Sequence, residues 1–442
     1  MARIGFISLG CAKNQVDCER MMYRVQEAGF EVQADVVGSD VVVINTCGFI
    51  DSAKSEAIDA ILQMAQLKEQ GLVGKILVTG CLSQRYQQQI LEELPEVDGI
   101  LGTGSYTEIV PAIESLLAQQ QVQDFGSIDA PEVETGRILT TPEHYAYIKI
   151  AEGCDNRCSY CIIPYLRGKY RSRQMDDVLY EARLLAANGV KELIVVAQDT
   201  SRYGIDLPGH KLLLADLLRE LCKIDGLRWI RIHYLYPDEI DDELIRVIAE
   251  EPKIVKYLDL PIQHCNSKIL QLMNRRGDGE FLRDLFKKLR ERIPGLVLRT
   301  SVITGLPGEG EEEFAELCEF LKEQQLERVG AFPFSPEEGT PAFDMEHPDE
   351  QTAQARAQMV ENIQSRIMDE YNAAIIGQTL DVLVDGFDEE FEQFYGRTYA
   401  DSPEIDGRVW IATEEAIAEG DFVRVQIDSL IDGDLAGFIV EE

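Results

Sequence analysis

Three continuous apolar runs near the N-terminus each end at a cysteine. The runs and their cysteines are residues 3–10 with Cys11, residues 40–46 with Cys47, and residues 75–80 with Cys81. Runs without polar alternation predict parallel strands that are buried on both faces. The cysteines recur at nearly equal intervals, each about one strand–helix unit long, and a helical segment follows each one. Residues 1–117 are therefore predicted to form an α/β domain with a parallel sheet.

The three cysteines after these runs, here called the strand-end cysteines, are predicted to share one edge of that sheet. The carboxyl ends of parallel strands meet at the edge where open α/β sheets bind ligands. A single cysteine in such a position is often an ordinary small buried residue. Three equivalent positions instead favour three thiolates that bind one metal cluster.

A second set, here called the loop cysteines, consists of Cys154, Cys158 and Cys161 in a C-x3-C-x2-C motif. One short loop can place three thiolates around an iron–sulfur cube, and three ligands leave the fourth iron open to a reactant. The alternative is structural zinc, which needs four ligands, usually in C-x2-C pairs. The next cysteine is Cys222 and the nearest upstream histidine is His144. The motif therefore favours a cluster.

A second α/β region is predicted after a polar linker at residues 118–139. Its candidate strands are residues 145–151, 192–197, 229–234, 257–260, 296–303 and 329–334. Six strand–helix units predict a partial or complete barrel over residues 140–370, with its active edge at the loops that follow the strands. Cys154 follows the first of these strands, where the chemistry of such a barrel is located.

The C-terminal residues 372–442 are predicted to form a small antiparallel β-barrel. Residues 379–385, 408–411 and 422–427 alternate or are β-branched, and glycine and aspartate separate them. Residues 373–442 hold 18 acidic residues and three arginines but no lysine, within a chain of net charge −37. A barrel that binds tRNA should be basic, whereas an acidic barrel suits a basic protein. A solvated acidic surface is the alternative.

Composition predicts a cytoplasmic protein. No apolar run approaches the ~18 residues of a membrane span. The N-terminus begins a strand at once and lacks the apolar core and cleavage site of a signal peptide. Ten cysteines at mainly loop positions fit metal binding in a reducing compartment better than a disulfide framework.

Three features in order resemble the methylthiotransferases, which are radical S-adenosylmethionine enzymes with two iron–sulfur clusters. These features are the strand-end cysteines, the segment GCDNRCSYCIIPYLRGKYRSR at residues 153–173, and a C-terminal barrel of the TRAM kind. The resemblance spans nearly the whole chain. It implies two [4Fe-4S] clusters, held by the strand-end and the loop cysteines, and S-adenosylmethionine as cofactors.

The resemblance also implies a different role for each of the two clusters. The cluster on the loop cysteines binds S-adenosylmethionine and generates a 5′-deoxyadenosyl radical. The cluster on the strand-end cysteines carries a sulfur that a second S-adenosylmethionine methylates. The methylthio group then passes to the substrate radical.

Three further segments resemble the members that methylthiolate the β-carbon of an aspartate in small-subunit ribosomal protein twelve. They are residues 197–204, 233–237 and 257–264. The implied partners are this basic protein or the assembled subunit, and an electron donor such as flavodoxin or ferredoxin. Direct nucleic-acid binding is not expected to dominate. The alternatives are a tRNA adenosine methylthiotransferase and a non-catalytic iron–sulfur or zinc protein.

Five residues are candidates for cofactor binding: Tyr160, Gln198, Asp199, Gly305 and Glu309. The first lies within the cysteine loop, the next two follow a predicted strand, and the last two belong to a segment similar to the adenosine-binding part of radical S-adenosylmethionine enzymes. The alternatives are barrel packing for the tyrosine and loop capping for Gln198 and Asp199. Other catalytic residues are not identified.

A local basic run within an acidic protein is a further candidate feature, formed by Arg167, Lys169, Arg171 and Arg173. It is predicted either to neutralise carboxylates of the cofactor or substrate or to form surface salt bridges. Three other cysteines lie in helical segments and are predicted to pack as ordinary core residues: Cys18, Cys222 and Cys318. Cys265 has no assigned role.

Overall fold

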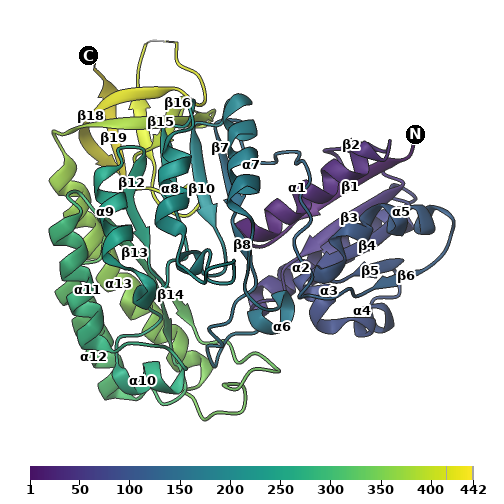
Figure 1. Cartoon of the computed structure of the whole chain (residues 1–442), viewed down its shortest axis with the longest axis horizontal. Helices are drawn as coiled ribbons and strands as arrows, with labels where there is room; N and C mark the ends of the chain where they lie inside the picture. Colours follow the sequence, from purple (N-terminus) through teal and green to yellow (C-terminus); the bar gives the residue numbers. More distant parts are fainter. Residues whose placement is uncertain (415, 441–442) are drawn as a thin grey trace.

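The structure is a computed structural model that describes residues 1–414 and 416–440. Three groups of elements follow one another along the chain, namely an N-terminal sheet with helices, a central sheet with helices, and a C-terminal barrel (Figure 1). None of the helices in the described ranges is both long and apolar enough to cross a membrane.

The N-terminal sheet is parallel and has the strand order β2-β1-β3-β4-β5-β6. Its strands are β1 (Arg3–Ser8), β2 (Glu31–Gln33), β3 (Val41–Thr46), β4 (Lys75–Gly80), β5 (Gly99–Leu101) and β6 (Val122–Asp124). Its helices are α1 (Ala12–Glu27), α2 (Asp51–Glu69), α3 (Cys81–Tyr86), α4 (Gln88–Glu93) and α5 (Ile109–Leu117), with a 3-10 turn η1 (Thr103–Glu108). Helices α1 and α5 pack on one face, and α2 packs on the other. Burial on both faces explains the continuous apolar runs.

Strands β2, β5 and β6 were not among the predicted strands. Each has three residues, which is too short for a periodic pattern to appear. Strand β6 lies within the predicted linker and pairs in parallel with β5. The sheet therefore extends beyond residue 117.

The central sheet is also parallel, and its strand order β14-β13-β12-β11-β10-β7 follows the chain. Its strands are β7 (Tyr145–Lys149), β10 (Glu192–Val196), β11 (Trp229–Ile232), β12 (Ile254–Asp259), β13 (Val297–Thr304) and β14 (Arg328–Pro333). The sheet is open between β7 and β14, so the predicted barrel is partial. A separate antiparallel pair consists of β8 (Ala151–Glu152) and β9 (Arg171–Ser172).

Helices cover the outer face of the central sheet and form the largest apolar core with it. The helices of this region are α6 (Ile163–Arg167), α7 (Met175–Ala187), α8 (Leu214–Cys222), α9 (Asp242–Glu250), α10 (Ser267–Leu272), α11 (Gly279–Arg292), α12 (Glu311–Gln324) and α13 (Glu350–Ile375). Two 3-10 turns, η2 (Thr200–Arg202) and η3 (Pro237–Glu239), follow β10 and β11. Buried charged side chains such as Lys149, Glu192 and Arg231 occur on the strands of this sheet.

The C-terminal barrel is closed, in the order β15-β16-β17-β19-β18. Its strands are β15 (Thr379–Asp388), β16 (Gln393–Arg397), β17 (Val409–Ala412), β18 (Phe422–Ile431) and β19 (Asp434–Ile439). Four neighbouring pairs are antiparallel, as predicted, and β17 pairs with β19 in parallel. A closed ring with an odd number of strands cannot alternate direction throughout, so one parallel pair is unavoidable.

The segment between β16 and β17 joins the barrel to the open central sheet. It reaches both edge strands of that sheet and its middle. Its side-chain contacts run from Tyr145 to Glu404 (3.2 Å), from Tyr257 to Asp406 (2.6 Å) and from Arg328 to Asp401 (2.8 Å). The barrel is therefore seated on the central sheet through buried polar contacts.

Candidate active site

The strand-end cysteines lie at the carboxyl ends of neighbouring parallel strands, as predicted. Cys11 lies between β1 and α1, Cys47 follows β3, and Cys81 is the first residue of α3 after β4. Because β3 pairs in parallel with both β1 and β4, the three positions occupy one edge of the N-terminal sheet.

Two glycines allow the backbones around these cysteines to approach closely. Gly10 has a φ of +89°, and a Cβ there would lie 2.7 Å from the Cβ of Cys47. A Cβ on Gly48 would lie 2.9 Å from the backbone nitrogen of Leu82, next to Cys81. No larger residue fits either position without moving a cysteine-bearing segment.

The strand-end thiols differ in exposure. Cys11 is exposed, Cys47 is half-buried and Cys81 is buried. Burial raises the pKa of the Cys81 thiol to about 11, against the opposing effect of the Arg167 guanidinium. Burial also raises the pKa of Cys47. Such thiols bind metal as thiolates, so metal binding displaces their protons.

The loop cysteines lie between β8 and α6, in a loop held from several sides. The backbone nitrogen of Cys154 donates to the carbonyl of Gly168 (3.1 Å). The side chain of Asn156 donates to Asp199 (2.7 Å), and Asn274 donates to the carbonyl of Arg157 (2.9 Å). Burial raises the pKa of the Cys154 thiol to about 12.

Two side chains that were not among the predicted site residues contact the sulfur of Cys158. The Tyr236 hydroxyl lies 3.7 Å from Sγ, and Nη1 of Arg275 lies 3.8 Å from it. Hydrogen bonds to ligand sulfurs tune an iron–sulfur cluster. Both residues are distant from the cysteine motif in the chain. Tyr236 lies in the segment 233–237 that carries part of the resemblance, whereas no pattern in the sequence marks Arg275.

The arrangement of the donors fits clusters better than single ions. Among the described residues, no group of three His, Cys, Asp or Glu side chains could hold a metal ion. In a cube each cysteine binds its own iron, so the thiols stand farther apart than the ligands of one zinc ion. Both sets of three thiols are therefore compatible with the predicted [4Fe-4S] clusters.

Tyr160, Gln198 and Asp199 lie near the loop cysteines and differ in their contacts. Tyr160 packs against the apolar cluster that includes Ile269, and its hydroxyl accepts a hydrogen bond from Arg275 (3.1 Å). Gln198 donates to Glu152 (2.7 Å), while its Oε1 is buried without a hydrogen-bond partner among the described atoms. Asp199 is buried and accepts from Asn156 and Ser201.

Gly305 and Glu309 belong to one turn that packs against α13. Glu309 Oε1 accepts from the backbone nitrogen of Gly305 and from Arg356, both at 2.8 Å. A Cβ on Gly305 would lie 2.5 Å from the Cβ of Ala353. Glu309 Oε2 and His264 Nε2 are 3.4 Å apart, and neither has a hydrogen-bond partner among the described residues.

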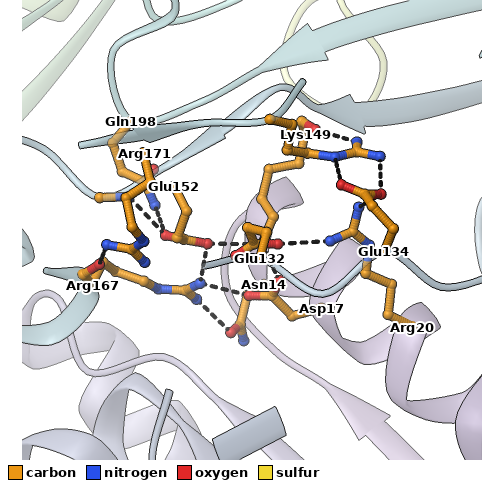
Figure 2. A network of polar contacts seen from close by, with 12 residues as sticks. Asn14, Asp17, Arg20, Glu132, Glu134, Lys149, Glu152, Arg167, Arg171 and Gln198 are labelled. Atoms are coloured by element: carbon orange, nitrogen blue, oxygen red, sulfur yellow. Dashed lines mark hydrogen bonds and ion pairs between the residues drawn. The ribbon is translucent and has the colours of Figure 1, made fainter. Parts of the chain in front are cut away.

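A buried network of charges joins the N-terminal and central regions (Figure 2). Arg167 Nη1 contacts Asp17 (2.5 Å) and Glu152 (3.1 Å), and its Nη2 donates to Asn14 (3.0 Å). Lys149 pairs with the same two carboxylates. We call Asp17, Lys149, Glu152 and Arg167 the charged joint. It connects helix α1, which follows Cys11, to the strand that precedes Cys154.

The charges of the joint stabilise one another. Burial opposes the charged form of Lys149, but the carboxylates of Asp17, Glu132 and Glu152 raise its pKa above the usual lysine value. Burial likewise opposes ionisation of Glu152, but Lys149 and Arg167 hold its pKa well below the usual range. Removing one member of such a buried set leaves an uncompensated charge, which costs about 3–5 kcal/mol.

Two of the four basic residues after the cysteine loop are buried, and they form ion pairs inside the protein instead of at its surface. Arg167 belongs to the charged joint, and Arg173 pairs with Glu134 and with Glu181 (2.6 Å). Both arginines are 3% exposed. They serve as internal partners for carboxylates of this chain, an outcome that neither predicted alternative included.

Of the cysteines outside the two sets, Cys18, Cys265 and Cys318 are buried and Cys222 is half-buried. Cys18 packs in the core between α1 and the N-terminal sheet. Cys265 and Cys318 are part of the core on the outer face of the central sheet, and Cys222 packs against it. These positions agree with the predicted packing role in α1, α8 and α12.

Three family models match consecutive parts of the chain. Residues 3–102 match the Uncharacterized protein family UPF0004, residues 148–321 match the Radical SAM superfamily, and residues 376–440 match the TRAM domain.

Curated relatives match the chain over its length. The ribosomal protein uS12 methylthiotransferase RimO of Anaeromyxobacter sp. (strain Fw109-5) is 48% identical over 443 residues, which cover 99% of this chain and 93% of that protein. The protein of the same name from Caldanaerobacter subterraneus subsp. tengcongensis is 47% identical over 439 residues, covering 99% of this chain and 100% of that protein.

Solved structures of much lower sequence identity share the fold. The radical S-adenosylmethionine methyltransferase TsrM from Kitasatospora setae, with tryptophan substrate and a SAM analog bound, has a TM-score of 0.57 at 14% identity. The match covers 77% of this chain and 74% of that chain. The cobalamin-dependent S-adenosylmethionine radical enzyme OxsB has a TM-score of 0.52 at 13% identity, covering 82% and 56% of the two chains. These likenesses concern the fold alone.

Proposed function

The chain belongs to the RimO family of ribosomal protein uS12 methylthiotransferases, and we propose that its two sets of cysteines form the two halves of one active site. It is a radical S-adenosylmethionine enzyme and a transferase, which works with S-adenosylmethionine and two [4Fe-4S] clusters. We propose that Cys154, Cys158 and Cys161 hold one cluster. The strand-end cysteines hold the other.

The observation that carries this proposal is the charged joint. Arg167 lies six residues after Cys161 and contacts Asp17, which lies six residues after Cys11. Its guanidinium is also close enough to Cys81 to oppose the rise in the pKa of that thiol. One buried side chain thus touches elements from both cysteine sets, which supports a shared cavity.

When bound, the clusters and S-adenosylmethionine supply the radical that abstracts hydrogen and the sulfur that replaces it. The chain's own residues have to orient these groups and exclude water. Tyr236 and Arg275 contact the Cys158 sulfur and would tune the cluster there. Asp199 holds the cysteine loop through Asn156, so we propose that it positions the cluster.

The other predicted cofactor contacts differ in whether their polar atoms already have hydrogen-bond partners within the chain. Gln198 has an unpartnered buried Oε1, and Tyr160 lies within the cysteine loop, so both are proposed to contact S-adenosylmethionine directly. The hydrogen bonds of Gly305 and Glu309 are internal to their turn and to α13. We propose that this pair shapes the wall of the cofactor site.

The proposed substrate is ribosomal protein uS12, which is named as the substrate of the relatives. We propose the β-carbon of an aspartate as the acceptor, on the free protein or on the assembled subunit. The acidic C-terminal barrel, with 18 acidic residues and three arginines in residues 373–442, supports a basic protein partner. Modification of tRNA adenosine is not favoured, because these relatives are named for uS12.

The remaining proposals concern the cellular setting and the division of the chain. A reduced flavodoxin or ferredoxin would supply electrons, and a ribosomal substrate implies a cytoplasmic enzyme.

We propose a cluster-binding N-terminal domain at residues 1–117, a linker at 118–139, a radical core at 140–370 and a TRAM domain at 372–442. Strand β6 adds an edge strand to the first domain from within the linker.

The test is an anaerobic incubation of reconstituted enzyme with reductant, S-adenosylmethionine and sulfide. A peptide that contains the aspartate of uS12 competes with unmodified tRNA, and mass spectrometry follows both. We expect a methylthio mass increase on the peptide and about eight iron atoms per chain. The Cys11→Ala variant should stop sulfur insertion but retain 5′-deoxyadenosine formation, whereas Cys154→Ala should lose both.

Two results would contradict the proposal. A mass increase on tRNA alone would exclude the protein substrate. Normal methylthiolation by the Cys11→Ala variant would show that the strand-end cysteines do not hold the second cluster.

A further inference from the structure

Lys13 is a buried cation at the boundary between the two halves of the site. It is the second residue of α1 and lies two residues after Cys11. It is 7% exposed. Its Nζ lies 3.3 Å from the centre of the Tyr234 ring. A lysine of the N-terminal region therefore contacts an aromatic ring of the central sheet.

The ammonium of Lys13 contacts Tyr234, but it has no carboxylate partner in the part of the chain that the structure describes. Within the described ranges, no carboxylate lies at ion-pair distance from its Nζ, unlike the buried Lys149, which has three. Burial opposes the charged form of Lys13, whereas Tyr234 and Cys11 favour it strongly enough to raise its pKa, and Arg167 opposes it. Contact with an aromatic face offsets only part of the cost of burying a charge. A buried lysine is usually paired with a carboxylate, and the described residues supply none at this position.

The position of Tyr234 links this ammonium to the loop cysteines. Tyr234 follows β11 at the carboxyl edge of the central sheet. Two residues later, the Tyr236 hydroxyl lies 3.7 Å from the sulfur of Cys158. The intervening segment is held in place, because the carbonyl of Tyr234 accepts from Thr200 (2.9 Å) and its backbone nitrogen donates to Asp259 (3.1 Å). One short rigid segment thus touches Lys13 on one side and a loop cysteine on the other.

We propose that Lys13 receives the side-chain carboxylate of the acceptor residue, and so selects an acidic side chain as the substrate. This inference rests on the proposed function, in which the acceptor enters the space between the two cysteine sets. A carboxylate there would complete an ion pair with the buried ammonium. An uncharged acceptor, such as asparagine or a nucleobase, would leave that ammonium without a carboxylate, and this selects against it.

S-adenosylmethionine also carries a carboxylate, so the same chemistry has a second possible source. The position of Lys13 favours the substrate, because Lys13 follows a strand-end cysteine on α1, whereas the proposed cofactor contacts, Tyr160 and Gln198, belong to the central region. The experiment therefore contains one arm for each carboxylate.

The test is a double-mutant cycle on the holoenzyme, kept anaerobic and without reductant so that no turnover occurs. Wild type and Lys13→Met are each titrated with a fluorescent uS12 peptide that carries the acceptor aspartate, and with the same peptide carrying asparagine. The same two proteins are titrated with S-adenosylmethionine and with its decarboxylated form. Lys75→Met is the matched control, because Lys75 lies at the opposite end of β4 from Cys81 and pairs with Asp98.

We expect Lys13→Met to weaken binding of the aspartate peptide about tenfold and that of the asparagine peptide less than twofold. Lys13→Arg should retain most of the preference, and Lys75→Met all of it. A general defect in folding or cluster content affects both peptides equally and cancels in the cycle.

Two results would overturn the inference alone: an unchanged aspartate preference in Lys13→Met, or coupling to the carboxylate of S-adenosylmethionine in place of the peptide. Failure of the wild-type enzyme to bind either peptide would instead overturn the proposed function and the inference with it.

Discussion

Gly10 illustrates how single residues decide whether the strand-end cysteines can form one site. Its φ of +89° is a conformation that residues with a side chain rarely adopt, and a Cβ placed there would lie 2.7 Å from the Cβ of Cys47, closer than two carbon atoms can pack. Gly29 has nearly the same φ, +88°, but no atom lies within 4 Å of a Cβ placed there. Substitutions at the two glycines can therefore distinguish the effect of backbone strain from the effect of crowding the cysteines.

Gly10→Ala is predicted to destroy the strand-end cluster and spare the loop cluster. The new methyl group would displace Cys47, so reconstituted enzyme should hold about four iron atoms per chain, against about eight in wild type. Gly29→Ala should cost about 1 kcal/mol of stability through strain alone and keep its full iron content. Iron analysis and absorbance spectroscopy check this result. Full iron content in Gly10→Ala would contradict the packing argument.

At the residue scale, spacing predicts the six cysteines as cluster ligands, whereas it does not predict their neighbours. The C-x3-C-x2-C motif lies within eight residues, and the strand-end positions follow a regular strand–helix repeat. Tyr236 and Arg275 reach Cys158 from separate loops of the central sheet. Such contacts depend on how strands pair, which no local pattern records.

At the scale of elements, helix α1 connects the two regions through one face. Asn14, Asp17 and Arg20 are spaced three residues apart and therefore lie on the same side of the helix. Each of them is buried and contacts a residue of the central region or the linker. In the sequence this polar face is indistinguishable from a solvated one, because hydropathy does not reveal buried partners.

The contacts of Glu181 in α7 allow a prediction of how acid affects the stability of the contact between the N-terminal and central regions. It pairs with Arg173 (2.6 Å), Arg137 (2.7 Å) and Arg20 (3.5 Å). Burial opposes its ionisation, but the three arginines lower its pKa from 4.5 to about 2. Because the folded-state pKa is the lower one, the unfolded chain takes up the proton first. Stability should therefore fall as the pH drops from about 4.5 towards about 2.

Glu181→Gln is expected to reduce this acid dependence and to lower the free energy of unfolding at pH 7 by about 3 kcal/mol, because it leaves buried arginines without their partner. Urea unfolding at pH 7, 5 and 3 measures both effects. Asp176→Asn, which changes an exposed acid of the same helix, is the control and should behave like wild type. An acid dependence as steep as that of wild type in Glu181→Gln would count against the assignment.

At the scale of the whole molecule, the C-terminal barrel is fixed on the central sheet. Arg397, the last residue of β16, pairs with Asp385 of the barrel (2.6 Å) and with Glu192 of β10 (2.7 Å). The segment that follows it spans the open sheet from Tyr145 to Arg328. A barrel held in this way presents its acidic surface at a defined position relative to the cysteine loop.

Arg397→Met is predicted to loosen this attachment. It leaves Glu192 with Arg231 as its one remaining cationic partner among the described residues, so we expect about 3 kcal/mol of destabilisation. Hydrogen exchange should become faster in residues 398–406. The control is Arg424→Met, which removes an exposed arginine of β18. Unchanged exchange in residues 398–406 would mean that the barrel is held by its other contacts.

The amino-acid sequence alone predicted the two parallel sheets, the acidic C-terminal barrel, the two sets of cysteines as cluster ligands and the class of chemistry. Each of these is recorded locally, in apolar periodicity, in motif spacing or in charge composition. It did not show the short strands β2, β5 and β6, whose pairing depends on the neighbouring strands already in place.

The contacts that join these parts become visible only in the folded chain. The pairs Arg167 with Asp17, Arg397 with Glu192, and Lys13 with Tyr234 each connect segments at least 150 residues apart. From sequence patterns alone, a charged side chain is expected to be exposed to solvent, and its burial beside a partner appears only in the folded chain. Burial then makes that partner indispensable, because an unpaired charge costs several kcal/mol away from water.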